Sequence, residues 1–416
     1  MGACYGASEM SLKKALVQPL LPYQRGGIAF AGGMRTPQWV LATGVLPGAF
    51  GSKKRPLSGE PAWTTQFRSL FARGAEVLSA GGSDLAHTVR CDQFVRDYRS
   101  VPFFHEMRRQ ACGKHIPPST TVLEDAVPLP EANITMNLVA RPAEGPAVEA
   151  VFPDGLDVPA TSSFVPVMKS GGLVFVAGFM AACKPGDLGG IAPEARVPEG
   201  HLWKGNRIQL ELDYLVKRKL KVALEGAGSS LERMVKADVS IRDMNDVPAF
   251  NQVWAKFFPG GMPATSFWPT ANPGLAIEDA RIEINCVAAE GALEARRIEL
   301  PQAARALCDG YPGAVRAGDL LFIPGLVASD ENGPVKKEMQ HLIALADALC
   351  RKAGTKLENV LRIQQVHTDL KDLKGACRAW QKRLPGLPLP LSAFQAPGPL
   401  LVPGCTVSID LWVYCP

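Results

Sequence analysis

The sequence lacks the usual signatures of metal, nucleotide and membrane chemistry. Its six histidines lie far apart and its ten cysteines form no CxxC pair, so there is no HExxH motif and no cluster with zinc spacing. A Walker loop and a GxGxxG motif after a strand are also missing. No apolar run approaches the roughly 18 residues that a membrane span needs. These absences predict no metal site, no bound cofactor and no membrane partner.

Charge is also scarce. The 45 basic and 40 acidic residues leave a net charge of +5, and the densest basic stretch, "GSKKRPLSG" (51–59), lies in a loop with glycine and proline. A solvated loop is the simpler interpretation, so we expect no nucleic-acid partner. The first residues, "MGACYGASEM", resemble neither a signal peptide nor a transit sequence. Because no secretory signal is expected and the cysteines are scattered along the sequence, we predict free thiols and a cytoplasmic protein.

What the chain does have is an internal repeat. The segments "GGSDLAHTVRCDQFVRD", "AGSSLERMVKADVSIRD" and "AGTKLENVLRIQQVHTD" align without a gap, at spacings of 146 and 126 residues. The shared positions are Gly82, Gly228 and Gly354, then Leu85, Leu231 and Leu357, then Asp97, Asp243 and Asp369. Because the spacing is that of a whole domain, each repeat is predicted to be one domain.

Each repeat shows the same order of patterns. Short apolar strands ("WVLATG", "LVFVAG", "LLFIPG") precede a helix with apolar residues at 3–4 spacing, which the shared glycine ends. A strand, a second helix, a turn and a closing strand follow ("NITMNLVA", "RIEINCVA", "TVSIDLWV"). Each repeat therefore predicts an α+β domain of order β-β-α-β-α-β-β, with both helices on one face of the sheet. Three such sheets can cover one another in a trimer-like ring; the alternative is three independent beads.

The sequence resembles the RidA/YjgF family. The resemblance rests on "GLVFVAG" (172–178), "LEGAGSSLERMVKADVSIRDMNDVPAFNQVWAKFF" (224–258) and "PATSF…ARIEINCVAA" (263–289). It implies chorismate-mutase-like domains that form trimers with a ligand cleft at each interface, here as an intramolecular pseudo-trimer, monomeric in solution. The predicted parts are an N-terminal extension (1–19), a degenerate first repeat (20–145), a second repeat closest to the family (155–292) and a degenerate third repeat (300–416).

The family's site residues carry over unevenly. In the second repeat, Glu283 keeps the catalytic glutamate, Asn251 keeps the asparagine that opens the second helix, and Gly178 keeps the glycine after the second strand. Phe164 stands for the family's tyrosine, and Thr265 stands where the family has the arginine that binds a substrate carboxylate. In the first repeat the corresponding residues are Tyr23, Thr43, Gly44, His105, Ser119 and Thr135. In the third repeat they are Tyr311, Pro324, Gly325, Cys377, Ser392 and Ser408.

These aligned positions, each a column of the alignment between the repeats and the family, define the predicted site. Glu283 and Asn251 are the catalytic candidates, and the predicted substrate-binding residues are Phe164, Gly178, Thr265, Phe267, Tyr311 and His105. Each has a plainer interpretation: a solvent-facing glutamate on an alternating strand, a helix cap for Asn251, a surface histidine for His105. The segment 180–207 belongs to the second repeat alone and is either a lid or a surface excursion.

The resemblance implies hydrolytic deamination of a reactive enamine or imine, or a related step on a small-molecule substrate, in an inter-repeat cleft with Glu283 at its centre. Since no repeat keeps the arginine, 2-aminoacrylate is a poorly supported substrate. The alternative is a catalytically inactive small-molecule-binding or scaffold protein, and ribonuclease activity comes third. Among the three clefts, one working site at most is expected, as a deep pocket lined by Glu283.

Overall fold

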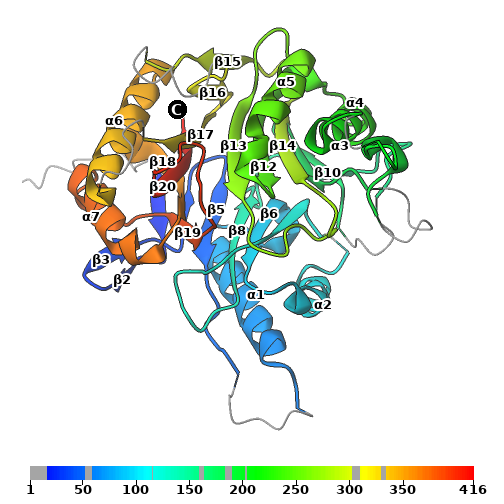
Figure 1. The fold of residues 1–416 in the computed structure, drawn as a ribbon. Helices are drawn as coiled ribbons and strands as arrows, with labels where there is room; N and C mark the ends of the chain where they lie inside the picture. The colour runs from blue at the N-terminus through cyan, green and yellow to red at the C-terminus, as the bar shows by residue number, and fades with distance from the viewer. Residues whose placement is uncertain are drawn as a thin grey trace, which may run out of the picture.

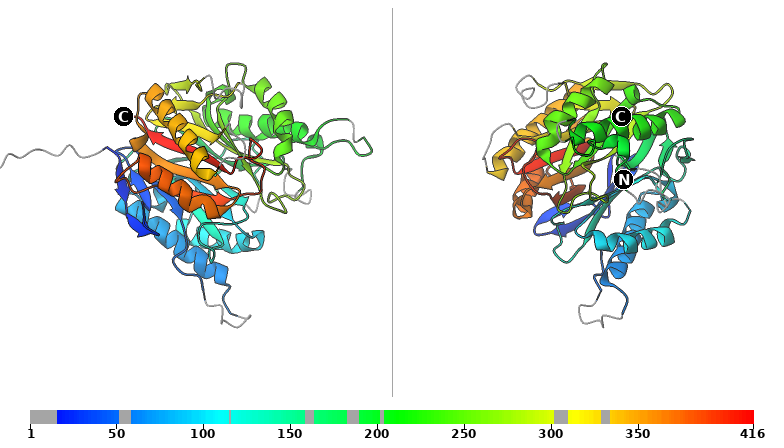
Figure 2. Two further views of the ribbon diagram at one scale, coloured as in Figure 1. Left: turned by 60° about the vertical axis from the view of Figure 1, so that its left-hand side comes forward. Right: turned by 45° about the vertical axis from the view of Figure 1, so that its right-hand side comes forward.

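The computed structural model describes residues 16–51, 59–114, 116–158, 164–182, 190–201, 204–301, 310–328 and 334–416. Three six-stranded sheets occupy the middle of the molecule, and helices lie on its outside (Figure 1). We call each sheet with its own helices a unit, numbered along the chain. Figure 2 shows the same arrangement from two further directions.

The first unit contains two helices, one main sheet and a separate two-stranded hairpin, β2–β3. Its elements are β1 (Gln18–Leu20), β2 (Tyr23–Arg25), β3 (Ile28–Phe30), β4 (Gly33–Arg35), β5 (Val40–Val45), α1 (Ala62–Ala80), β6 (Thr88–Val95), α2 (Val101–Cys112), β7 (Ser119–Leu123) and β8 (Ile134–Ala140).

The second unit differs in its first helix, which is continuous but passes through a π-helical turn at Val216–Leu220. Its elements are β9 (Glu149–Val151), β10 (Val167–Ser170), β11 (Leu173–Phe179), α3 (Arg207–Leu215), α4 (Lys221–Gly226), β12 (Met234–Ile241), α5 (Val247–Phe257), β13 (Ala264–Pro269) and β14 (Ile282–Ala289).

The third unit repeats the order with two helices. Its elements are β15 (Ala295–Ile298), β16 (Ala314–Ala317), β17 (Leu320–Val327), α6 (Val335–Ala353), β18 (Val360–His367), α7 (Leu373–Arg383), β19 (Leu391–Gln395) and β20 (Val407–Tyr414).

The three main sheets have equivalent strand orders: β1-β4-β5-β8-β6-β7, β9-β10-β11-β14-β12-β13 and β15-β16-β17-β20-β18-β19. In each, one parallel pair (β6–β7, β12–β13 or β18–β19) closes an otherwise antiparallel sheet. The predicted order of elements is therefore confirmed for each unit, with one additional strand at the sheet edge. The α+β class is confirmed as well.

The shared glycine and aspartate have structural roles. Gly82, Gly228 and Gly354 adopt φ of +72°, +77° and +81°, a left-handed conformation that a side chain would strain. Asp97, Asp243 and Asp369 each accept a hydrogen bond from the backbone N–H two residues later, at 2.9 Å, and so begin a short 3₁₀ helix. The most repeated residues of the sequence thus build the turns and are not a repeated catalytic motif.

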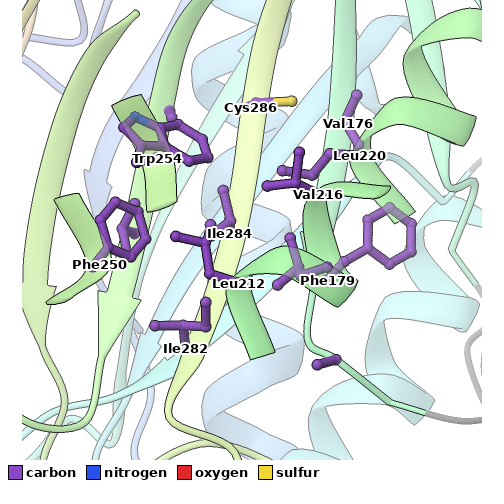
Figure 3. Close-up of a cluster of buried hydrophobic side chains, with 14 of the residues drawn as sticks. Val176, Phe179, Leu212, Val216, Leu220, Phe250, Trp254, Ile282, Ile284 and Cys286 are labelled. Atoms are coloured by element: carbon purple, nitrogen blue, oxygen red, sulfur yellow. The ribbon is translucent and has the colours of Figure 1, made fainter. Parts of the chain in front are cut away.

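Each sheet buries both of its faces. On one face the helices of the same unit enclose an apolar core, shown for the second unit in Figure 3, where Ile282 and Ile284 point among Phe250, Trp254 and Leu212. On the other face, residues from all three sheets join one common core. That core includes Trp39, Leu41, Phe175, Val235, Phe322 and Trp412. Because side chains alternate along a strand, Glu283 points away from the helices and toward the neighbouring units.

Six buried charged residues also meet between the sheets. Three occupy one aligned column, Arg90, Lys236 and Arg362, and three are acids, Asp92, Asp238 and Asp410. Each cation contacts two of the acids, at 2.5–3.4 Å, so that the contacts form a closed ring through all three units. Burial opposes ionisation of Asp238, yet the cations Lys236 and Arg90 hold its pKa below its ordinary value. The ring joins the three sheets through charges that water does not screen.

In the described part of the chain, no helix is both long and apolar enough to cross a membrane.

Candidate functional site

A bulge interrupts the same strand in every unit, at the position of the family's glycine. The pairing register shifts between Ala42 and Val45 in β5, between Val176 and Phe179 in β11, and between Ile323 and Leu326 in β17. Bulges of this kind bend a strand and are common beside functional sites. Each bulge contains the glycine that faces another unit, so the three bulges mark three equivalent boundaries.

The glycines identify which units meet. A side chain at Gly178 would overlap the carboxyl of Glu283 and lie 2.9 Å from Oγ1 of Thr120 in the first unit. The N–H of Gly325 donates to Oγ of Ser266 in the second unit at 2.8 Å. A side chain at Gly44 would overlap the backbone of Leu391 in the third unit. We name these the 1–2, 2–3 and 3–1 boundaries.

Glu283 is the acid at the 1–2 boundary. It lies on β14, 5% exposed, beside Gly178 and across from Thr120. Burial raises the pKa of its carboxyl to about 8, because a low-dielectric environment disfavours the charged form. Glu283 is therefore largely protonated at neutral pH, and poised to exchange a proton near that pH. This placement excludes the interpretation of Glu283 as a solvent-facing residue.

Two further acidic groups accompany Glu283. The hydroxyl of Tyr98 is buried without a hydrogen-bond partner, and burial raises its pKa, with further contributions from the carboxyls of Glu283 and Glu124. Glu124, which follows β7, is 1% exposed; burial raises its pKa well above the ordinary value and both of its oxygens lack a partner. Three proton-carrying groups from two units thus share this region.

A buried arginine of the first unit contacts the residue that stands in the column of the family's arginine. Arg108, on α2, is 1% exposed and donates from Nη1 to Oγ of Ser119 at 2.7 Å. Its Nε and Nη2 have no hydrogen-bond partner, and among the described residues no carboxylate pairs with it. Ser119 is the first-unit residue in the column of the family's arginine. A guanidinium therefore occupies that region after all, but it comes from a helix instead of the strand.

His105 and Phe164 contribute less directly. His105 precedes Arg108 by one helical turn, and burial together with Arg108 and Arg109 lowers its pKa to about 4. It is therefore neutral at neutral pH and a weaker base than an ordinary histidine. Phe164 is half-buried on the second unit's core, next to Val165, whose N–H donates to the carbonyl of Ile116 in the first unit.

The 2–3 boundary holds the other predicted residues. Asn251 accepts a hydrogen bond from the hydroxyl of Tyr311, whose ring packs edge-on against Phe267 at 6.2 Å between centroids. Thr265 turns its hydroxyl to the carbonyl of Pro263 at 3.0 Å. A cavity of about 40 Å³ beside them holds little more than a water molecule. Ser408 stands in the glutamate column here.

The 3–1 boundary encloses more space. A cavity of about 260 Å³ lies among Tyr23, Gly44, Thr135 and Cys377, which are the predicted residues of the first and third repeats. Glu283 lines neither this cavity nor the smaller one at the 2–3 boundary. Glu283 itself is buried, and the expectation of one deep pocket lined by it stays a prediction.

The predicted site is therefore two groups of residues. Glu283, Gly178, Phe164 and His105 belong to the 1–2 boundary, whereas Asn251, Thr265, Phe267 and Tyr311 belong to the 2–3 boundary. The division follows from the fold, since the edge strand of one unit faces the bulged strand of the next. A second difference concerns register. Ser392 pairs with Gln364, so it occupies the column of Ser266, and Leu391 occupies that of Thr265.

Three residues escaped prediction although the repeats contain a signal for them. In the ungapped alignment, Arg108 stands in a column with Trp254 and Trp380, both buried apolar residues. Tyr98 aligns with Met244 and Leu370. Glu124 aligns with Thr270 and Ala396. Arg108 and Tyr98 are polar residues in columns that are otherwise apolar, whereas Glu124 is the one charged residue of its column; all three belong to the first unit.

The segment 180–207 packs on the second unit where it is described. Ile191, Ala192 and Ala195 join the second unit's helix-side core, and the N–H of Ala192 donates to the carbonyl of Ala181 at 2.8 Å. Residues 183–189 and 202–203 lie outside the described residues. The described part is anchored on the helix side of the second unit, and the choice between a lid and a surface excursion stays open.

Comparison with known proteins places the chain in a family. A family model described as "Endoribonuclease L-PSP" matches residues 156–290. The chain is 35% identical over 123 residues to protein mmf2, mitochondrial, of Schizosaccharomyces pombe. The aligned region covers 30% of this chain and 84% of that protein. It is 30% identical over 140 residues to 3-aminoacrylate deaminase RutC of Acinetobacter baylyi, covering 34% of this chain and 96% of that protein. The solved structure of yeast Mmf1 shares 26% identity over 35% of this chain and 100% of its own, with a TM-score of 0.28. The chain belongs to the RidA/YjgF family.

Proposed function

We propose that the chain hydrolyses a small, reactive enamine or imine to a carbonyl compound and ammonia at the 1–2 boundary. The observation that carries the proposal is the buried Glu283, whose pKa of about 8 suits a group that gives and takes protons near neutral pH. Family membership supports the same chemistry. Relatives include 3-aminoacrylate deaminase RutC and a 2-iminobutanoate/2-iminopropanoate deaminase of Dermatophagoides farinae.

Glu283 would act as acid and base in turn. Its protonated carboxyl gives a proton to the β-carbon of the enamine, which becomes an iminium ion, and the carboxylate then takes a proton as water adds to the iminium carbon. The resulting carbinolamine receives a proton on nitrogen from Glu283. Ammonia leaves as the hydroxyl proton returns to the carboxylate, so the carbonyl forms and Glu283 is regenerated. No metal or cofactor enters this sequence.

Arg108 would hold the anionic end of the substrate. Its unpaired Nε–H and Nη2–H groups can form a bidentate pair with a carboxylate, which is the geometry that a guanidinium favours. Since burial of an uncompensated charge is costly, a substrate anion would also relieve an unfavourable feature of the ligand-free protein. The proposal therefore favours imines and enamines that carry a carboxylate.

We also propose that the three units are RidA-like domains forming a pseudo-trimer, with bounds near 20–145, 155–292 and 300–416. Equivalent strand orders, a core shared by all three sheets and the ring of buried charges support this arrangement. Because each sheet already covers the others, we expect a monomer of 44.6 kDa in light scattering. A trimer of chains would contradict the arrangement.

The test of function is ammonia release from imines and enamines generated in situ by an amino-acid oxidase or a dehydratase. Glu283→Gln should lower turnover by about 10²–10⁴-fold, the usual contribution of general acid–base catalysis. Ser408→Ala is the matched control, because Ser408 occupies the same column at the 2–3 boundary and should leave turnover unchanged. Equal activity of Glu283→Gln and wild type would remove Glu283 from the mechanism.

A further inference from the structure

The ring of buried charges borders a small cavity, which we call the central cavity. It measures about 20 Å³, so it has room for one water molecule or an ion of similar size. Arg90 and Asp92 line it from the first unit, Asp238 from the second, and Arg362 and Gln364 from the third. Because all three units contribute, the central cavity differs from those at the 2–3 and 3–1 boundaries, each of which is lined by two units.

Aromatic side chains cover the central cavity on one side. Phe94 of the first unit and Trp268 of the second belong to its lining. Phe394 of the third unit stacks on Phe94 with 4.3 Å between ring centroids and packs edge-on against Trp268 at 6.3 Å. All three rings are buried. With this cover and this volume, the cavity excludes organic molecules and admits a monatomic ligand.

The third unit differs from the others at one position in the lining. Gln364 stands in the column of Asp92 and Asp238. In each sheet, this residue and the one opposite it on the closing strand are an acid and an amide: Asp92–Asn137, Asp238–Asn285 and Gln364–Asp410. The third unit has therefore exchanged the two, which keeps the charge of the ring and puts an amide where the other units have a carboxylate.

Neighbouring hydrogen bonds fix the orientation of this amide. The backbone N–H of Gly44 donates to Oδ1 of Asn137 at 2.8 Å, so the side-chain nitrogen of Asn137 is the group that donates to Oε1 of Gln364, at 2.9 Å. Nε2 of Gln364 is then left over. It is buried without a hydrogen-bond partner, on a residue that is 2% exposed. Such a donor is costly unless a ligand accepts from it.

Two arginine nitrogens share this condition. Nη1 of Arg90 and Nε of Arg362 are buried and have no hydrogen-bond partner, although both residues line the central cavity. Their guanidinium carbons lie 5.6 and 4.7 Å from the ring centroid of Trp412, which helps to hold both groups in place. The cavity is thus bordered by three residues with an unused N–H donor, from two units.

The lining favours an anion over a water molecule. Among the described lining residues, the buried side-chain atoms without a partner are these three donors. Asp92 and Asp238 each contact two cations of the ring, so their charges are already compensated. Water brings two hydrogens that need acceptors of their own, whereas a monatomic anion only accepts.

We infer that the central cavity binds one halide ion, of the size of chloride or bromide, which joins the first and third units through Arg90, Arg362 and Gln364. The bound ion stabilises the packing of the three units, because it accepts from donors that otherwise stay unsatisfied. This site is structural and has no part in turnover. The inference goes beyond the proposed deaminase activity and does not depend on it.

A crystal of the full chain grown in sodium bromide tests the site directly. Anomalous scattering at the bromine absorption edge should show a peak in the central cavity, within hydrogen-bond distance of the three unpaired nitrogens. This measurement needs no variant, so it decides the question even if substitutions prevent folding. Density for water without an anomalous peak, or an empty cavity, would overturn the inference.

Urea unfolding measures the contribution of the ion to stability. Chloride is replaced stepwise by gluconate, which is too large for the cavity, at constant sodium concentration. Above the dissociation constant of the site, the folding equilibrium constant should rise about tenfold for each tenfold increase in chloride. Bromide should act like chloride. Equal stability in chloride and gluconate would contradict a bound halide.

Gln364→Glu tests the position of the ion. The substitution keeps the acceptor for Asn137 and replaces the unused N–H donor with a carboxylate oxygen, so both the bromide peak and the chloride dependence should be lost. Gln365→Glu is the matched control. Gln365 is the next residue of β18, is fully buried, and points to the opposite face of the sheet, where its Oε1 lies 2.8 Å from Nε2 of His367.

The control should keep the chloride dependence of the wild type, whatever its own stability. Chloride dependence that survives in Gln364→Glu, or that disappears equally in both variants, would show that the stabilising ion binds elsewhere and would overturn the assignment to the central cavity.

Discussion

Arg108 donates a hydrogen bond to the hydroxyl of Ser119 at 2.7 Å, from a position that the other two units fill with tryptophan. Trp254 and Trp380 are fully buried in the cores of their units. A buried guanidinium with unpaired N–H groups in place of an indole is unfavourable for stability. The first unit therefore has a stability cost at the place where the proposed substrate binds, as functional sites often do.

The first prediction concerns this arginine. Arg108→Met should raise the free energy of unfolding, measured by urea denaturation, by about 1–2 kcal/mol. The variant removes an unpaired buried charge and retains most of the side-chain volume. The same variant should raise KM for a carboxylate-bearing imine more than tenfold and change KM for its amide analogue little. Arg109→Met, an exposed neighbour on α2, is the control. A destabilised Arg108→Met would indicate a structural role for the charge.

A second prediction follows from the pKa of Glu283. Since the folded state raises this pKa from 4.5 to about 8, folding binds a proton between those values. The stability from this carboxyl is present below about pH 4.5 and is lost as pH rises through the window to about 8, by at most about 5 kcal/mol. Unfolding midpoints of wild type should therefore fall relative to those of Glu283→Gln between pH 5 and pH 8. Parallel pH profiles of the two proteins would show that Glu283 titrates normally.

The third prediction concerns the lost arginine column of the second unit. Thr265→Arg places the family's arginine in its column, but the adjacent cavity measures only about 40 Å³ and Ser408 stands where the glutamate is needed. We expect the variant to lose about 1–3 kcal/mol of stability through overpacking and to gain no turnover at this boundary. Thermal unfolding and ammonia release measure the two effects. New activity that persists in Thr265→Arg/Glu283→Gln would show that the 2–3 boundary can become catalytic.

The ring of buried charges gives the fourth prediction. Lys236 is fully buried and contacts Asp238 at 2.6 Å and Asp410 at 2.8 Å, so Lys236→Met leaves two buried carboxylates short of a cation. The cost should be about 3–5 kcal/mol, measured by urea unfolding. Lys217→Met breaks the exposed pair with Asp213 and should cost less than about 1 kcal/mol. A similar small loss in both variants would mean that the ring adds little to stability.

The sequence by itself determined the repeated unit. The glycine, leucine and aspartate columns predict its turns because a left-handed glycine and an aspartate cap act within a few residues of the chain. The alternation of Ile282, Glu283 and Ile284 likewise predicts that the glutamate faces away from the helices. These are local properties, so one strand or turn contains the information.

The tertiary structure decided which residues share a site. Glu283 and Asn251 belong to one repeat, yet they face different neighbours, because the edge strand of one unit meets the bulged strand of the next. Thr120 and Tyr98 share the surroundings of Glu283, although they lie more than a hundred residues earlier in the chain. No periodicity in the sequence encodes such an approach, since it depends on how three sheets pack around a common core.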